Sequence, residues 1–85
     1  MSKEEKLIKR FLSKPKDFTY NELRKLLFNF GYEESQSGKT SGSRVAFINI
    51  RTNHIIRLHK PHPNEELKIY QIEQLIEELQ SRRLL

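Results

Sequence analysis

Two runs of alternating apolar and polar residues, Ser43–Ile50 and His54–His59, stand only three residues apart in this chain. Successive side chains of a strand point to opposite faces of a sheet, so each run predicts a β-strand. The intervening Arg51-Thr52-Asn53 predicts a tight turn, because Asn53 tolerates positive φ. Any fold of this chain is therefore expected to contain an antiparallel hairpin.

The alternation assigns each residue of the hairpin to one of two faces. One face is predicted to hold Val45, Phe47, Asn49, His54, Ile56 and Leu58. The opposite face is predicted to hold Arg44, Ala46, Ile48, Ile50, Ile55, Arg57 and His59. If the strands pair across the turn, Arg44 lies beside His59 to Pro61, at the end of the hairpin away from the turn.

Helical periodicity surrounds the hairpin. A first helix is predicted over about Lys3 to Leu12, because its apolar residues, Leu7, Ile8, Phe11 and Leu12, recur at helical spacing. It should end near Leu12 or Ser13, because Pro15 removes a backbone donor and disfavours helical geometry in the residue before it. A second helix is predicted to start at a capping box, for which Thr19 and Glu22 have the spacing, and to end before Gly31, which suits a left-handed C-terminal cap. The segment Tyr32–Ser37 is interpreted as a short polar strand.

The last helix is predicted to begin after Asn64, which can cap it, with Glu65 and Glu66 in its first turn. Its apolar stripe consists of Ile69, Ile72, Leu75, Ile76 and Leu79. The predicted order is α-α-β-β-β-α. This α+β pattern favours one domain over residues 1–85, in which helices cover one face of a three-stranded antiparallel sheet.

Composition excludes several classes of function. The chain has no cysteine, so disulfides, thiolate metal sites and a cysteine nucleophile are excluded. No stretch approaches the ~20 apolar residues that span a bilayer, and no signal peptide is evident, so a cytoplasmic protein without membrane contact is expected.

Basic residues are unevenly distributed. Sixteen Lys and Arg against eleven Asp and Glu give a net charge of +5. The segment from Lys39 to Lys60 contains five basic residues and no Asp or Glu. A field of this sign favours RNA, DNA or an acidic protein surface. The alternative is a solvated sheet with ordinary surface charge.

Two apparent motifs are rejected. Gly38-Lys39-Thr40 has the ending of a phosphate-binding loop, but that motif needs a glycine five residues earlier, where this chain has Glu33, and a helix after it. His59 and His62 have metal-ligand-like spacing, but an extended chain would not hold two such imidazoles convergent. Neither a metal site nor a cofactor is expected.

One ordered string of motifs remains. It runs from Lys39-Thr40-Ser41-Gly42-Ser43-Arg44 through the strands to Leu58-His59-Lys60-Pro61-His62-Pro63, and then to Glu66-Leu67-Lys68, Tyr70 and Ile72. This string resembles that of the HicA family, small toxin ribonucleases that act on mRNA and are silenced by a HicB antitoxin, and the likeness covers roughly residues 20 to 80 of the chain. The chain departs from the family at one place, since Gly42-Ser43-Arg44 replaces the family's Gly-Ser-His.

The resemblance implies a double-stranded-RNA-binding-like α-β-β-β-α fold, with a core at residues 19–80 and an added helix within residues 1–13. It also implies an mRNA endoribonuclease that needs no metal, and a HicB-like antitoxin as protein partner. The competing interpretation is a catalytically lapsed HicA-like module that binds only RNA or a HicB-like protein.

The resemblance also assigns residues. Arg44 can bind phosphate but cannot remove a proton near neutral pH, so the catalytic pair is predicted to be Arg44 with His59 as the proton acceptor. His59 matches the second histidine of the family, in the Leu-His that ends the last strand. RNA contacts are predicted for Lys39, Ser41, Ser43, Arg44, Arg57, Lys60 and His62.

The other histidines and the apolar outer face have plainer interpretations. His54 is most simply a partly buried structural residue. His62, between two prolines, is a fixed reactive group or part of a stiff connection, and we favour the structural role. The face around Ile48 and Ile55 is too apolar to be left in water, so we expect something to pack against it. The added helix, an antitoxin or a second copy of the chain could do so.

Overall fold

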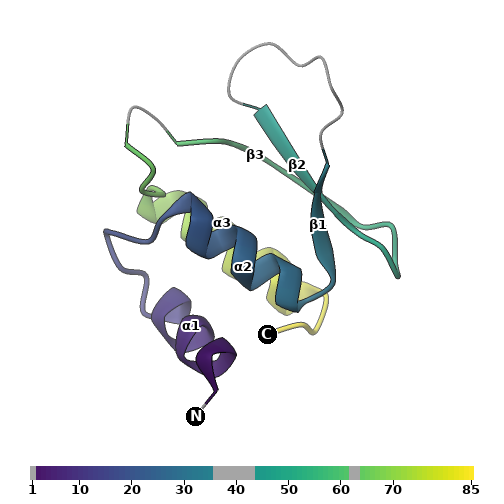
Figure 1. Ribbon diagram of the computed structural model, residues 1–85, viewed down its shortest axis with the longest axis horizontal. Coiled ribbons are helices and arrows are strands. Elements are labelled where there is room, and N and C mark those ends of the chain that lie inside the picture. The colour runs from purple at the N-terminus through teal and green to yellow at the C-terminus, as the bar shows by residue number, and fades with distance from the viewer. Residues whose placement is uncertain (1, 36–43, 62–63) are drawn as a thin grey trace.

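The computed structural model describes residues 2–35, 44–61 and 64–85. The elements follow the predicted order (Figure 1). They are α1 (Lys3–Leu12), α2 (Tyr20–Asn29), β1 (Tyr32–Ser35), β2 (Arg44–Asn49), β3 (Ile55–His59) and α3 (Ile69–Ser81).

The three strands form one antiparallel sheet in the order β1-β2-β3. Strands β2 and β3 pair across the predicted turn, with Phe47 opposite Ile56 and Arg44 opposite His59. Asn53 adopts the expected positive φ of 61°. Phe47 and Ile56 are buried while Arg57 and His59 are exposed, which confirms the assignment of the two faces.

Local sequence signals set the ends of the first two helices. Helix α1 ends at Leu12, and Lys14 turns to a left-handed φ of 53° directly before Pro15. The predicted capping box opens α2, because Thr19 accepts from the backbone N–H of Glu22 and the Glu22 carboxylate accepts from the backbone N–H of Thr19. Gly31 follows α2 with a φ of 93°, as the left-handed cap requires.

The predicted start of the last helix is wrong. Helix α3 begins at Ile69, with Lys68 rather than Asn64 at its N-cap, and Glu65 and Glu66 lie before it. The intervening segment is extended because it pairs with the entry to α2: the Leu67 N–H donates to the Phe18 carbonyl, and the Tyr20 N–H donates to the Glu65 carbonyl, both at 2.8 Å. These backbone bonds outweigh the local helix signal of Asn64.

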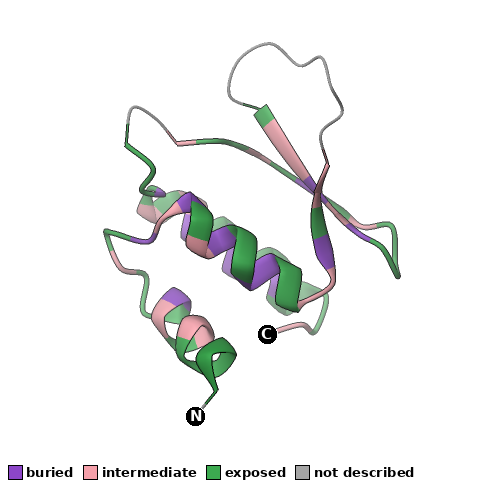
Figure 2. Cartoon of the chain, in the orientation of Figure 1, coloured by how far each residue is buried: buried purple, intermediate pink, exposed green. Residues whose placement is uncertain are grey.

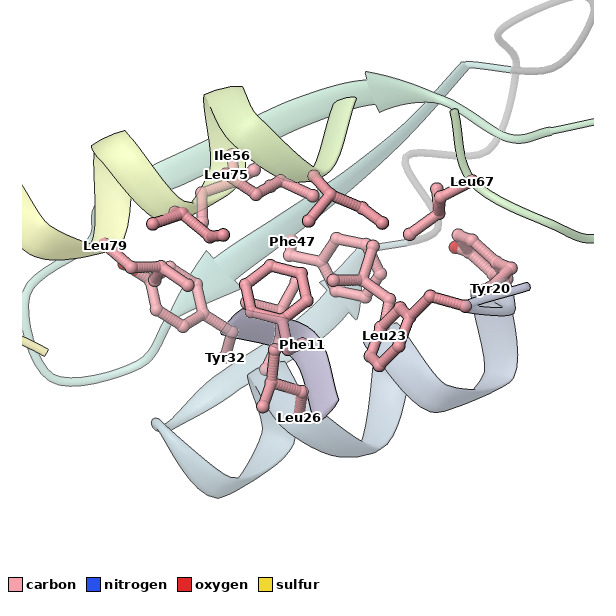
Figure 3. Packing of buried hydrophobic residues seen from close by; sticks show 14 residues of the cluster. Phe11, Tyr20, Leu23, Leu26, Tyr32, Phe47, Ile56, Leu67, Leu75 and Leu79 are labelled. Carbon is pink, nitrogen blue, oxygen red and sulfur yellow. The ribbon is translucent and has the colours of Figure 1, made fainter. Parts of the chain in front are cut away.

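The core lies between the sheet and the helices (Figure 3). Helix α2 contributes Leu23, Leu26 and Leu27, and α3 contributes Ile72, Leu75, Ile76 and Leu79. In Figure 2 the buried residues of α2 recur at helical spacing along one side of the helix. In the part of the chain that the structure describes, this arrangement leaves the opposite face of the sheet, which carries Arg44, Arg57 and His59, without a helix over it.

Helix α1 packs on the helices, away from the sheet (Figure 1). Its Phe11 is fully buried, and the Phe11 and Phe18 rings meet at a centroid distance of 5.1 Å. Arg10 pairs with Glu22 at 2.8 Å, and this pairing holds the pKa of the Glu22 carboxyl below its usual range. Helix α1 is therefore not the cover of the apolar outer face.

Within the described ranges, none of the three helices is both long and apolar enough to cross a membrane.

Candidate nucleic-acid interface

The sheet brings two predicted site residues together at its open end. Arg44 begins β2 and His59 ends β3, and the two are direct partners in the antiparallel register. Both are exposed and their side chains leave the sheet on the same face, because directly paired residues point the same way. The predicted juxtaposition of Arg44 and His59 is confirmed.

Arg57 extends this cationic group along β3. It lies opposite Ala46 on the same outer face, two residues from His59. The next pair on this face is Ile48 and Ile55, and Ile55 is 38% exposed. The outer face therefore changes from basic at the open end of the hairpin to apolar near the turn.

Gln71 fixes the end of the strand that carries His59. Its side-chain oxygen accepts from the Lys68 N–H at 3.0 Å, and its side-chain nitrogen donates to the His59 carbonyl at 3.1 Å. One side chain thus joins the first turn of α3 to the end of β3. This link holds the backbone at His59 while the imidazole stays exposed.

The Lys60 side chain contacts helix α2 and does not join Arg44 and His59 on the outer face. Its Nζ atom stands 5.2 Å from the ring centroid of Tyr20, a cation–π contact with the first residue of α2. The Tyr20 hydroxyl donates to the Glu34 carboxylate, and burial together with this carboxylate raises the pKa of Tyr20 above its usual value. Lys60 is therefore drawn toward the helices and away from the outer face that holds Arg44.

A second basic surface continues from Lys60. A groove of about 660 Å³ is lined by Lys16, Lys60 and Lys68, with Glu66 as its acidic member. It runs past Tyr70 at the start of α3. Of the basic residues predicted to contact RNA, Arg44 and Arg57 thus lie on the outer face of the sheet, and Lys60 lines this groove.

His54 belongs to the opposite end of the hairpin. The Tyr32 hydroxyl is 2.7 Å from Nδ1 of His54, and Nε2 of His54 is 2.8 Å from the Glu78 carboxylate. Burial raises the pKa of Tyr32 above its usual value. This geometry agrees with the predicted structural role of His54. The contact with Glu78 is not predictable from local sequence, because His54 and Glu78 are far apart in the chain.

Four predicted RNA-contact residues, namely Lys39, Ser41, Ser43 and His62, lie outside the described residues. Among the residues with described positions, no group of three or more His, Asp or Glu side chains could hold a metal ion.

The element order and the sheet define a double-stranded-RNA-binding-like α-β-β-β-α fold preceded by an additional helix. The family model described as HicA toxin of bacterial toxin-antitoxin matches residues 20–80. The chain therefore belongs to the HicA toxin family, whose toxins pair with HicB antitoxins. Helix α1 lies outside the matched residues. No curated protein and no solved structure matches the chain.

Proposed function

We propose that this HicA toxin is a metal-independent mRNA endoribonuclease whose catalytic pair is Arg44 and His59. The supporting observation is their direct pairing on the exposed sheet face. A guanidinium that binds phosphate and an imidazole that accepts a proton are the two kinds of group that RNA cleavage through the ribose 2′-hydroxyl needs.

In the proposed reaction, Arg44 pairs with a backbone phosphate and His59 takes the proton from the neighbouring 2′-hydroxyl. The 2′-oxygen attacks phosphorus, the bond from phosphorus to the 5′-oxygen breaks, and the leaving oxygen takes a proton from water. The hydroxide left behind takes the proton from His59, which returns the imidazole to its neutral form. The products are a 2′,3′-cyclic phosphate and a 5′-hydroxyl end. Histidine suits the first step because its ordinary titration lies nearest to neutral pH.

The remaining cations would hold the RNA on either side of the scissile phosphate. Arg57 lies on the same face as the catalytic pair, and Lys60 adjoins the groove lined by Lys16 and Lys68. We also assign RNA contacts to Lys39, Ser41, Ser43 and His62 on the strength of the family resemblance. Phosphate contacts of this kind position a nucleic acid and make its binding sensitive to salt.

The second candidate function is an RNA-binding or partner-binding module that no longer cleaves. The observation in its favour is the arginine at position 44, where the family pattern has histidine. In this interpretation the cationic face still binds RNA, but His59 alone does not support the chemistry.

One pair of proteins separates the two candidates. Wild type and Arg44→His are purified without antitoxin and incubated with single-stranded RNA in the presence of EDTA. Cyclic-phosphate products from both proteins would support the ribonuclease. Products from Arg44→His alone would identify a lapsed enzyme, and binding without cleavage by both would favour a pure binder.

We further propose that a HicB-like antitoxin is the protein partner and that it silences the toxin. The exposed basic face that would bind RNA also suits an acidic protein surface. Growth arrest by the toxin expressed alone, relieved by co-expression of a HicB-like protein, is the expected result. Persistent arrest despite formation of the complex would contradict the proposed silencing.

A further inference from the structure

Strand β3 has an open edge. In the sheet order β1-β2-β3 its neighbour among the described strands is β2. The Asn49 N–H donates to the His54 carbonyl at 2.9 Å, which fixes the alternation of hydrogen bonds along this antiparallel pair. By that alternation His54, Ile56 and Leu58 direct their backbone groups to β2. The backbone groups of Ile55, Arg57 and His59 point to the free edge.

A groove runs along this edge. It has a volume of about 180 Å³ and lies between β3 and α3, with Ile56 and Leu58 on the strand side. Leu75 and the half-exposed Tyr70 line the helix side. Figure 3 shows Ile56 and Leu75 close together where the strand meets the helix. These four residues form the apolar part of the groove, which Gln71, Gln74 and Glu78 also line.

Two side-chain links close the groove at its ends. At one end Gln71 donates to the His59 carbonyl at 3.1 Å. At the other end His54 pairs with Glu78 at 2.8 Å. Between these links, the backbone N–H and C=O groups of Ile55 and Arg57 face the open edge. The open stretch has the length of a short added strand.

We propose that this edge is the docking site of an extended segment from a protein partner, in which apolar residues alternate with acidic ones. The segment would add a fourth strand beside β3. Alternate side chains would then enter the groove over Leu75 and Tyr70. The others would lie on the outer face of the sheet, beside Arg57 and His59, where carboxylates complement the local charge.

A second copy of this chain fits the edge poorly. Antiparallel pairing of β3 with β3 of another copy, through the backbone groups of Ile55 and Arg57, puts the two Arg57 side chains opposite or diagonal to each other. Like charges at such positions destabilise a pair of strands. Charge therefore selects an acidic strand over a copy of β3. This proposal does not depend on whether the chain cleaves RNA.

Hydrogen exchange tests the proposal. The probe is a blocked peptide of alternating valine and glutamate, added to the isotopically labelled full chain. We expect the exchange rates of the Ile55 and Arg57 amides to fall by a factor of about ten or more when the peptide is present, because these amides then become hydrogen-bonded. A peptide of alternating valine and lysine should give no such protection. Equal protection by both peptides, or by neither, would overturn the proposal.

A matched pair of variants isolates the backbone contact. Ile55→Pro removes an N–H that points to the free edge and should abolish the protection of Arg57 by the peptide. Ile55→Ala shortens the same side chain but keeps the N–H, so protection should remain. Protection that survives Ile55→Pro would contradict strand addition.

Two further measurements address other occupants. Slower exchange of the Ile55 and Arg57 amides as the concentration of the chain alone increases, together with a dimer in sedimentation, would identify a second copy as the occupant. Protection of these amides by a single-stranded RNA but not by the acidic peptide would identify RNA. Either result would overturn the proposal, and neither depends on cleavage activity.

Discussion

The histidine directly before β3, His54, and the histidine that ends β3, His59, have opposite surroundings. His54 is enclosed, with a side-chain exposure of 15%, and both ring nitrogens have partners in Tyr32 and Glu78. His59 is exposed, and within the described residues its ring makes no hydrogen bond, while its backbone is held by Gln71. A histidine whose two nitrogens are occupied stabilises the fold, whereas one with a fixed backbone and an open ring is available for chemistry.

The largest effect expected from this comparison is on catalysis. His59→Ala should lower the rate of RNA cleavage by about 10²–10⁴-fold, the usual contribution of a general base. Its unfolding transition in urea should match that of the wild type, because the bond from Gln71 goes to the His59 backbone. Undiminished cleavage by the folded variant would exclude His59 as the base.

The next effect is on stability. His54→Ala removes the partner of the nearly buried Tyr32 hydroxyl and of Glu78, so we expect a loss of about 1–3 kcal/mol in the free energy of unfolding. Urea denaturation followed by circular dichroism measures this loss, with His59→Ala as the matched control. Equal stability of the two variants would remove the distinction between the histidines.

A smaller effect should appear in alkaline solution. Burial raises the pKa of Tyr32, so the folded chain holds this proton more tightly than the unfolded chain, in which tyrosine titrates near ~10. The corresponding stability is complete below that pH and is lost as the pH rises through the folded-state pKa.

Tyr32→Phe should therefore reduce the alkaline loss of stability and cost about 1 kcal/mol at neutral pH through the lost hydrogen bond to His54. The pKa of Tyr20 is also raised, so part of the alkaline dependence should remain. Denaturation curves of wild type and variant across alkaline pH give the comparison. Parallel curves would show that Tyr32 does not contribute to the alkaline loss.

The smallest effect is expected at the exposed end of the His54 network. Glu78→Gln should lower the free energy of unfolding by less than about 1 kcal/mol, since Glu78 is partly exposed and polar contacts at the surface contribute little. Glu77→Gln, on the neighbouring exposed position of α3, is the control. A loss as large as that of His54→Ala would mean that the contact with Glu78, and not the Tyr32 contact, carries the role of His54.

Sequence reasoning succeeded where short-range patterns decide the structure. The capping box of Thr19 and Glu22, the left-handed Gly31 and the alternation on either side of Asn53 each depend on neighbours in the chain. The capping box and Gly31 predicted helix α2, and the alternation around Asn53 predicted the hairpin that places Arg44 beside His59.

It failed where contacts between distant segments decide. Asn64 has the side chain of a helix cap, but the backbone bond from Leu67 to Phe18 keeps the following residues extended. The position of Lys60 over Tyr20 and the pairing of His54 with Glu78 also join segments far apart in sequence. Periodicity carries no information about such partners.

The turn at Arg51-Thr52-Asn53 has a consequence for how this toxin could be disarmed. Side chains alternate between the two faces of a strand. If one residue were inserted in the turn and β3 shifted its pairing by one residue, the imidazole of His59 would lie on the helix side of the sheet. Arg44 would then stand alone on the outer face. A single added codon, far from either side chain, could thus inactivate the toxin while leaving every residue of the pair in the gene.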